Sequence, residues 1–211
     1  MPPALLVIAK EPLPGRVKTR LTPPCTPDQA AAMARAALVD TLTAAAGAHF
    51  AGRRVVVLDG EPGEWLPSGF EVIPQRGDGL AERLAAAFDD VAEPAFLVGM
   101  DTPQLSPWQL DAGLSAVAWG DSAFGPAFDG GYWGIGLRTP DPEIFAGVPM
   151  STEDTGSVQY ARMLERGLQP AILPPLRDVD TFDVAVAVAA EAPRTHFAAA
   201  LAAVNDDGVA G

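Results

Sequence analysis

Cysteine and histidine are almost absent from this chain of 211 residues. Cys25 is the only cysteine, so an intrachain disulfide is impossible and a zinc site made of several thiolates is excluded. His49 and His196 are the only histidines, so a metal site rich in imidazole is not expected either.

Positive charge is also scarce, with 14 Lys and Arg residues against 27 Asp and Glu, which gives a net charge of −13. Binding to nucleic acid or to an anionic membrane requires a basic face, so neither partner is expected. No stretch reaches the roughly 18 apolar residues of a membrane span. The opening apolar run is shorter than the roughly 7–15 residues of a signal-peptide core, which predicts a cytoplasmic protein.

Apolar residues make up 48% of the chain, which together with its length favours a globular protein with a sizeable core. We expect one domain over residues 1–204 and a flexible tail over 205–211. Trp65, Trp108 and Trp119 are each expected to be buried.

Short β-like runs alternate with alanine-rich helical windows. Strands are predicted at 4–10, 53–60, 69–75, 94–101, 122–128, 131–137 and 170–175. Helices are predicted at 26–46, 78–92, 106–118, 151–167 and 182–204, the last interrupted near Pro193. This alternation predicts an α/β fold with a mostly parallel sheet and right-handed crossovers.

Four of the few basic residues lie in one stretch, AKEPLPGRVKTRL (9–21), directly after the first strand. Pro12, Pro14 and Gly15 prevent the strand or a helix from continuing there. Ligands of open α/β sheets bind beyond the carboxyl ends of the strands, so the stretch is interpreted as a phosphate cradle. Its cations are Lys10, Arg16, Lys18 and Arg20. The alternative is a solvated surface loop.

Aspartates mark two further segments. Asp101 ends the strand predicted at 94–101 and is suited to a hard cation such as Mg²⁺, although a turn or cap role is equally open. Asp178 and Asp180 alternate in RDVDTFDV, so they share a face if the segment is extended. Asp183 is better interpreted as a helix cap. In FDGGYWGIGL, Gly130 and Gly131 allow close backbone approach to a ligand, and the two aromatic residues that follow either stack on it or pack in the core.

In their order and spacing, AKEPLPGRVKTRL, GMDTPQL, DGGYWGIGL and DVDTFDV resemble the rSAM/selenodomain-associated transferase 1 family of bacteria. This family belongs to the nucleotide-diphospho-sugar transferase superfamily, which has the GT-A fold. The resemblance covers roughly residues 4–190 and implies a three-layer α/β/α Rossmann-like architecture with a mixed, mostly parallel central sheet. The wider superfamily includes molybdenum-cofactor nucleotidylyltransferases and 2-phospholactate guanylyltransferase.

The same resemblance implies roles for individual residues. Lys18, Arg20 and Asp101 would be catalytic, and Asp101 and Asp180 would bind Mg²⁺ or Mn²⁺. Nucleotide binding would involve Ala9, Lys10, Gly15, Arg16, Lys18, Arg20 and Asp78. Acceptor binding would involve Asp129, Gly130, Gly131 and Tyr132. The first loop departs from the usual GxGxRxGxxK pattern because prolines replace glycines.

Two reactions fit these residues. A nucleotidyltransferase would move an NMP from an NTP to a small phosphorylated or hydroxyl acceptor and release pyrophosphate. A glycosyltransferase would use a nucleotide-diphospho-sugar, but Gly99 stands where a DxD motif would have its first aspartate, so nucleotidyl transfer is favoured. A non-catalytic nucleotide-binding module is the third possibility.

Overall fold

The computed structural model describes residues 2–209, with side chains up to residue 205. Its seven strands form one sheet in the order β3-β2-β1-β4-β6-β5-β7. All strands run in one direction except β6, which is antiparallel to both of its neighbours. The strands are β1 (Ala4–Lys10), β2 (Arg54–Asp59), β3 (Glu71–Pro74), β4 (Ala95–Val98), β5 (Ser122–Pro126), β6 (Tyr132–Leu137) and β7 (Ala171–Ile172). The predicted mixed, mostly parallel sheet is confirmed.

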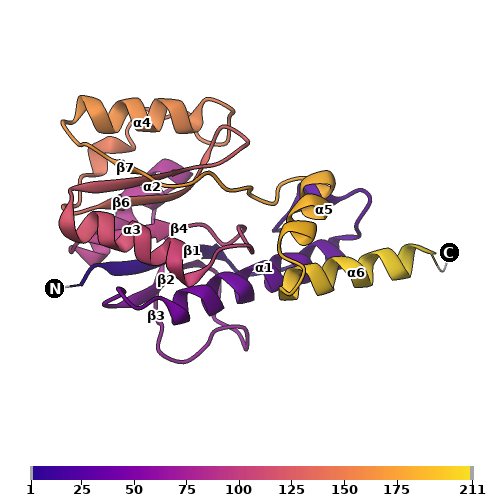
Figure 1. The fold of residues 1–211 in the computed structure, drawn as a ribbon. Coiled ribbons are helices and arrows are strands. Elements are labelled where there is room, and N and C mark those ends of the chain that lie inside the picture. The colour runs from indigo at the N-terminus through magenta and orange to yellow at the C-terminus, as the bar shows by residue number, and fades with distance from the viewer. Residues whose placement is uncertain (1, 210–211) are drawn as a thin grey trace.

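Helices cover both faces of this sheet, which confirms the three-layer α/β/α architecture (Figure 1). On one face lie α1 (Pro27–Gly47) and α3 (Pro107–Trp119). On the other lie α2 (Leu80–Val91), α4 (Thr155–Glu165) and the 3₁₀ helix η2 (Pro142–Ile144).

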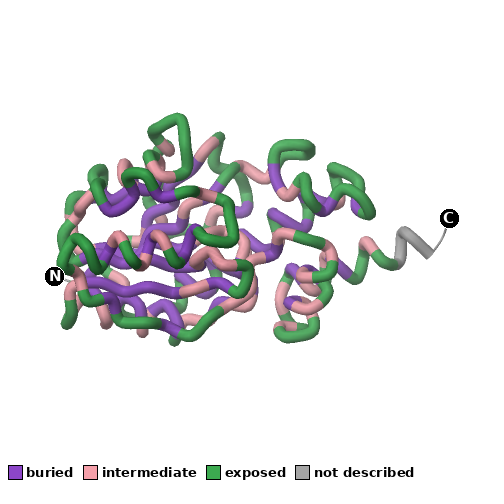
Figure 2. The backbone as a smooth tube through the Cα atoms, turned by 90° about the horizontal axis from the view of Figure 1, so that it is seen from above, coloured by how far each residue is buried: buried purple, intermediate pink, exposed green. Residues whose placement is uncertain are grey.

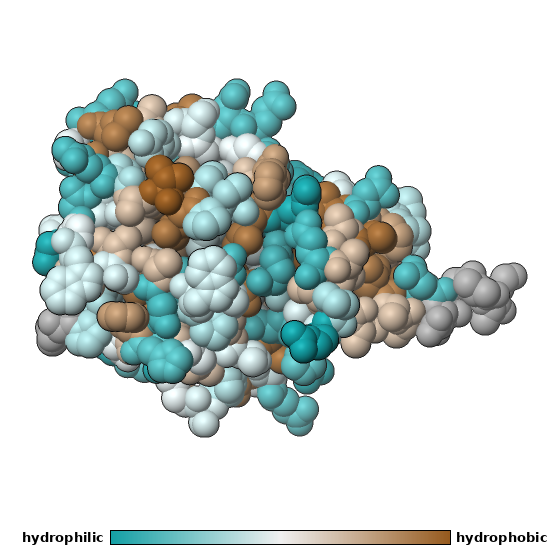
Figure 3. Space-filling view, viewed as in Figure 1, coloured by the Kyte–Doolittle hydropathy of each residue, from teal (hydrophilic) through white to brown (hydrophobic). Residues whose placement is uncertain are grey.

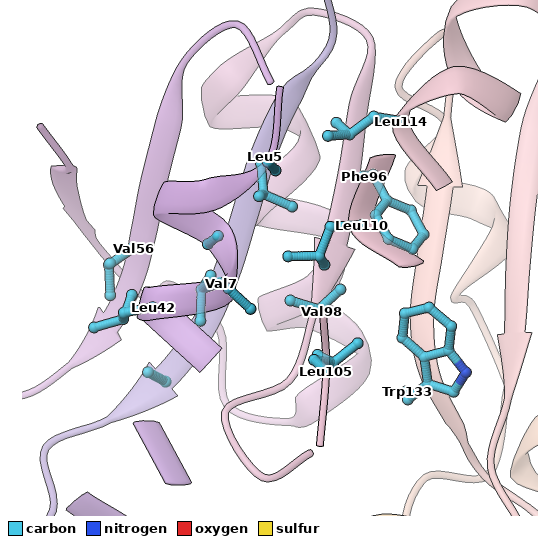
Figure 4. Close-up of a cluster of buried hydrophobic side chains, with 14 of the residues drawn as sticks. Leu5, Val7, Leu42, Val56, Phe96, Val98, Leu105, Leu110, Leu114 and Trp133 are labelled. Atoms are coloured by element: carbon cyan, nitrogen blue, oxygen red, sulfur yellow. The ribbon is translucent and has the colours of Figure 1, made fainter. Parts of the chain in front are cut away.

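Successive side chains of the central strands point to opposite faces of the sheet, so each face has its own hydrophobic core. In β1, Leu5 and Val7 face α1 and α3, whereas Leu6 faces α2. Within the first core, the rings of Phe96 and Trp133 meet edge to face with centroids 5.8 Å apart (Figure 4). Such edge contacts are favourable beyond the burial of apolar area.

The tryptophans differ from expectation. Trp65 is buried as predicted, but Trp108 and Trp119 on α3 are 62% and 81% exposed. Both lie on the face of α3 that points away from the sheet, which hydrophobicity alone does not reveal.

Local capping signals locate two helix starts correctly. Thr26 and Gln29 form a capping box at α1, with Pro27 in the first helical position, and α3 begins at Pro107 as expected. The helix predicted at 151–167 instead begins at Thr155, because Ser151 has a positive φ of 61° and the Thr155 hydroxyl bonds to Pro149 and Thr152. The prediction of a capped start at 151 is therefore wrong.

The last two helices, α5 (Phe182–Glu191) and α6 (His196–Val209), are separated at the predicted break near Pro193. They pack with the first half of α1 to form a lobe beyond the carboxyl ends of the strands (Figures 1 and 2). The buried Asp40 carboxylate accepts the backbone N–H groups of His196 and Phe197, which fixes the start of α6 on α1. Because α6 continues to Val209, residues 205–209 of the predicted tail are helical, and residues 210–211 lie outside the described residues.

None of the described helices combines the length and the apolar character needed to cross a bilayer.

Candidate functional site

The carboxyl edge of the sheet brings the sequence motifs together. There β1 ends at Lys10 and β4 at Val98, and the reversed strand β6 begins at Tyr132. A cavity of about 830 Å³ opens at this edge, bounded on the far side by Thr181 and Val184 of the α5 region. In Figure 3, hydrophilic residues form a band between the sheet body and the α5–α6 lobe.

Most of the predicted site residues line this cavity. Gly15 and Gly130 are not among its lining residues. The predicted residues that do line it are Ala9, Lys10, Arg16, Lys18, Arg20, Asp78, Asp101, Asp129, Gly131, Tyr132 and Asp180.

The basic loop is anchored by apolar residues between its cations. Val17 is buried against α1, and Leu21 is fully buried in the lobe. Arg16 and Arg20 remain exposed, with Arg16 3.8 Å from Asp59 and Arg20 2.9 Å from Asp180. Apolar anchoring of a proline-rich loop thus keeps its guanidinium groups at the cavity.

Lys18 lies at the centre of the site. Its Nζ is 2.7 Å from Asp101 Oδ2 and 3.2 Å from Asp180 Oδ1, and its side chain is only 10% exposed. Burial alone would lower the pKa of Lys18, but the ion pairs with Asp101 and Asp180 outweigh it and raise the pKa above its usual value. Two carboxylates that are far apart in the sequence therefore converge on one cation.

The aspartates are held by the segment that follows β7. The Val179 amide donates to the Asp101 carbonyl at 3.0 Å, and the buried Thr102 hydroxyl donates to Asp178 Oδ1 at 2.6 Å. Burial and the nearby negative charge of Asp101 raise the pKa of Asp178 to about 8. Asp101 itself lies beyond Val98, the last residue of β4, so the strand predicted at 94–101 is too long.

A divalent cation fits this donor set. Among the described residues there is no group of three or more His, Cys, Asp or Glu side chains that could hold a metal by themselves. Asp101 and Asp180 nevertheless place oxygens around one shared cation position, which Lys18 marks. Mg²⁺ typically uses one or two carboxylates and completes its shell with water and substrate phosphates, so two aspartates suffice.

Gly130 serves the protein's own packing. Gly130 has a φ of +89°, its carbonyl accepts the Gly156 amide at 2.7 Å, and a Cβ there would come within 2.0 Å of the Glu153 carbonyl. The close backbone approach predicted at Gly130 is therefore made to the segment before α4. Gly15, with a φ of +73°, turns the basic loop, and a Cβ added there would have no other atom within 4 Å.

Both aromatic residues pack in the protein interior, although Tyr132 also lines the cavity. Trp133 is buried, and its indole N–H donates to the Pro174 carbonyl at 3.0 Å. Tyr132 lines the cavity beside Asp129, whose Oδ1 accepts the Gly131 amide at 2.9 Å.

Sequence reasoning missed three residues near β2 and β3. Arg83 donates to Asp59 Oδ2 at 2.8 Å and to Gln75 Oε1 at 3.1 Å. The Gln75 amide in turn donates to the carbonyls of Ala9 and Val57. Asp59 and Gln75 each lie at the carboxyl end of a strand, and this position could have identified them as candidate site residues.

A family model covers a large part of the chain. It matches residues 28–152 and is described as an uncharacterized protein conserved in bacteria (DUF2064). The chain belongs to this family. The matched region contains Asp78, Asp101 and the 129–132 segment, whereas the basic loop and Asp180 lie outside it. Among the curated proteins, none matches the chain.

Solved structures share the fold over almost the whole chain. A protein of Desulfovibrio desulfuricans G20, described as a nucleotide-diphospho-sugar transferase, is 29% identical with a TM-score of 0.84, over 96% of this chain and 95% of that one. 2-C-methyl-D-erythritol 4-phosphate cytidylyltransferase from Thermus thermophilus is 18% identical with a TM-score of 0.55, over 92% and 100%. Rv0371c of Mycobacterium tuberculosis H37Rv, in a complex with manganese, is 18% identical with a TM-score of 0.53, over 88% and 97%.

Proposed function

We propose that this protein is a nucleotidyltransferase that moves an NMP from an NTP to a small acceptor, with Mg²⁺ or Mn²⁺ as the cofactor. The observation that carries the proposal is the convergence of Asp101 and Asp180 on one cation position, in a cavity also lined by Lys10, Arg16 and Arg20. A polyphosphate matches the basic side chains, and a divalent ion matches the two carboxylates.

The reaction needs positioning and charge neutralisation more than proton transfer. An acceptor oxygen forms a bond to the α-phosphorus, the bond from that phosphorus to the bridging oxygen breaks, and its electron pair leaves with pyrophosphate. When the acceptor is a hydroxyl, its proton passes to water or to the departing pyrophosphate. Lys10, Arg16 and Arg20 line the cavity where they can neutralise the phosphate oxygens and the departing charge. When bound, the divalent ion would supply further charge neutralisation. No histidine or cysteine lines the described cavity, which is consistent with direct displacement.

The space around Gly99 supports nucleotidyl over sugar transfer. A Cβ at Gly99 would lie 2.9 Å from Asp101 Oδ1. An aspartate could not enter this position without displacing the Asp101 carboxylate. A DxD pair here would therefore require the Asp101 side chain to move from its contact with Lys18.

The part of the cavity beyond β4, where we place the acceptor, differs in charge from the part beside the basic loop, where we place the NTP. Beyond β4, the lining residues include Asp129, Tyr132, Ser151, Thr152 and Glu153. None of the described lining residues on this side is basic. This favours a hydroxyl acceptor over a phosphorylated one.

Sugar transfer remains the competing candidate because one protein of the same fold, 29% identical over nearly the whole chain, is described as a nucleotide-diphospho-sugar transferase. The two reactions differ in product. Nucleotidyl transfer releases pyrophosphate from an NTP, and sugar transfer releases a nucleoside diphosphate from a sugar nucleotide.

The test incubates the protein with each NTP, Mg²⁺ and a panel of neutral and phosphorylated hydroxyl compounds, and measures pyrophosphate. Asp180→Asn should abolish release. Asp183→Asn is the matched control, because Asp183 is an exposed neighbour on the same segment and does not line the cavity.

Three results are informative. Pyrophosphate released by the wild type and Asp183→Asn, but not by Asp180→Asn, supports the proposal. Nucleoside diphosphate released only from sugar nucleotides refutes it in favour of sugar transfer. Nucleotide binding that raises the melting temperature without any turnover would identify a non-catalytic module.

A further inference from the structure

Lys18 is the most enclosed of the four cations in the basic loop. Its ammonium lies at the cavity wall between the Asp101 and Asp180 carboxylates, at 2.7 and 3.2 Å, and its side chain is only 10% exposed. Lys10, Arg16 and Arg20 are far more exposed at the cavity, although Arg20 also contacts Asp180 at 2.9 Å. The lysine expected to contact phosphate is thus held by the two residues expected to bind metal.

An ammonium and a divalent ion cannot share this position. Mg²⁺ lies about 2.0–2.1 Å from its oxygen ligands, so an ion bound to both carboxylates would fall within the space that Nζ fills. Two adjacent positive charges also repel at short range. Binding of the metal therefore requires the Lys18 side chain to leave.

The local backbone is consistent with a side chain held in place by its partners. Lys18 has φ 48° and ψ 37°, a left-handed conformation that is unfavourable for a residue with a Cβ. Such conformations cluster at ligand sites and persist when the surroundings enforce them. The four-carbon stem can carry the ammonium away by side-chain rotation alone.

We propose that Lys18 is an internal cation that pairs with Asp101 and Asp180 until a divalent ion displaces it, and that the freed ammonium then faces the nucleotide phosphates. The inference rests on the proposed metal-dependent nucleotide chemistry. Metal binding would create a phosphate contact, and by reciprocity nucleotide binding would favour the metal. Lys18 is then a residue that couples the two ligands as well as one that binds phosphate.

Lysine labelling of the wild-type protein tests this without any substitution. The sequence has only two lysines, Lys10 and Lys18, so Lys10 serves as the internal reference. The protein is treated with an acetylating reagent with and without Mn²⁺, and both sites are quantified by mass spectrometry. Labelling of Lys18 relative to Lys10 should rise severalfold with Mn²⁺. An unchanged ratio at saturating Mn²⁺ would overturn the proposal.

Metal affinity in the absence of nucleotide gives a second test. Calorimetric titration with Mn²⁺ should show Lys18→Met binding roughly tenfold more tightly than the wild type, within the usual range of coupling between two sites. Lys18→Arg keeps a competing cation and should stay near the wild-type affinity. Equal or weaker Mn²⁺ binding by Lys18→Met, or no binding by either protein, would refute the displacement.

These outcomes separate the inference from the proposed function. If the wild type releases pyrophosphate but the labelling ratio does not change, the proposed function stands and the displacement of Lys18 is refuted. If Mn²⁺ displaces Lys18 but no turnover occurs, the displacement stands and the proposed function is refuted. A melting curve of Lys18→Met checks its fold, and the labelling result decides the matter if that variant is unstable.

Discussion

Gly130 and Gly15 form a matched pair for testing what holds the segment around Gly130 against the start of α4. Both have positive φ angles, +89° and +73°, so alanine at either position meets the same kind of backbone strain. Only at Gly130 is the space for a side chain occupied, because a Cβ there would lie 2.0 Å from the Glu153 carbonyl oxygen. Comparing Gly130→Ala with Gly15→Ala therefore isolates the free-energy cost of moving Gly130 away from Glu153.

The magnitudes follow from these contacts. Backbone strain costs about 1–2 kcal/mol in each variant. Gly130→Ala adds an overpacking cost of about 1–3 kcal/mol and the loss of one hydrogen bond, the 2.7 Å bond to the Gly156 amide, at about 1 kcal/mol. Gly130→Ala should therefore reduce the free energy of unfolding by roughly 3–6 kcal/mol and Gly15→Ala by roughly 1–2 kcal/mol.

Urea and thermal unfolding of both variants measure the difference. For a chain of this size, each 1 kcal/mol corresponds to about 2–4 °C in melting temperature, so the two variants should differ by at least about 4 °C. Equal losses of stability would mean that contact with the segment before α4 does not explain the glycine at position 130.

Three further substitutions test other parts of the structure. Asp59→Asn should cost about 1 kcal/mol at neutral pH, because the Arg83 hydrogen bond lowers the pKa of the Asp59 carboxyl. The difference from the wild type should shrink as pH falls through that lowered pKa in urea titrations, and a constant difference would refute the assignment. Gly99→Ala should leave the melting temperature almost unchanged but reduce turnover roughly tenfold, because its Cβ would displace the Asp101 carboxylate, and full turnover would contradict this. Trp119→Ala should change the free energy of unfolding by less than about 0.5 kcal/mol, since that side chain is 81% exposed, and a larger loss would mean that it is covered in solution.

Local signals were sufficient to predict most of the fold. Alternating strands and helices indicated the α/β architecture, and the Thr26-Pro27 pair indicated the start of α1 within one residue. The start of α4 was wrong because it depends on tertiary contacts: the Thr155 hydroxyl and the Gly156 amide bond to segments that precede the helix, including Gly130.

The residues of the candidate site could be predicted one by one, but the contacts between their side chains could not. The position after each strand indicated Lys10 and Asp101, and the charged loop indicated Lys18. Sequence does not reveal that Lys18 pairs with both aspartates, since this depends on how the segment after β7 returns to the edge of β4. Arg83 was missed because the sequence pattern of α2 indicates which apolar residues face the core, but not which charged residues reach the cavity.

In the proposed enzyme, a divalent ion and a polyphosphate bind together between the basic loop and the two aspartates. A crystal grown with Mn²⁺ and a non-hydrolysable NTP analogue tests it through anomalous scattering. The expected result is a Mn²⁺ peak between Asp101 and Asp180, with phosphate density beside Lys10, Arg16 and Arg20. A nucleotide bound elsewhere, or one bound in the cavity with no Mn²⁺ at the two carboxylates, would contradict it.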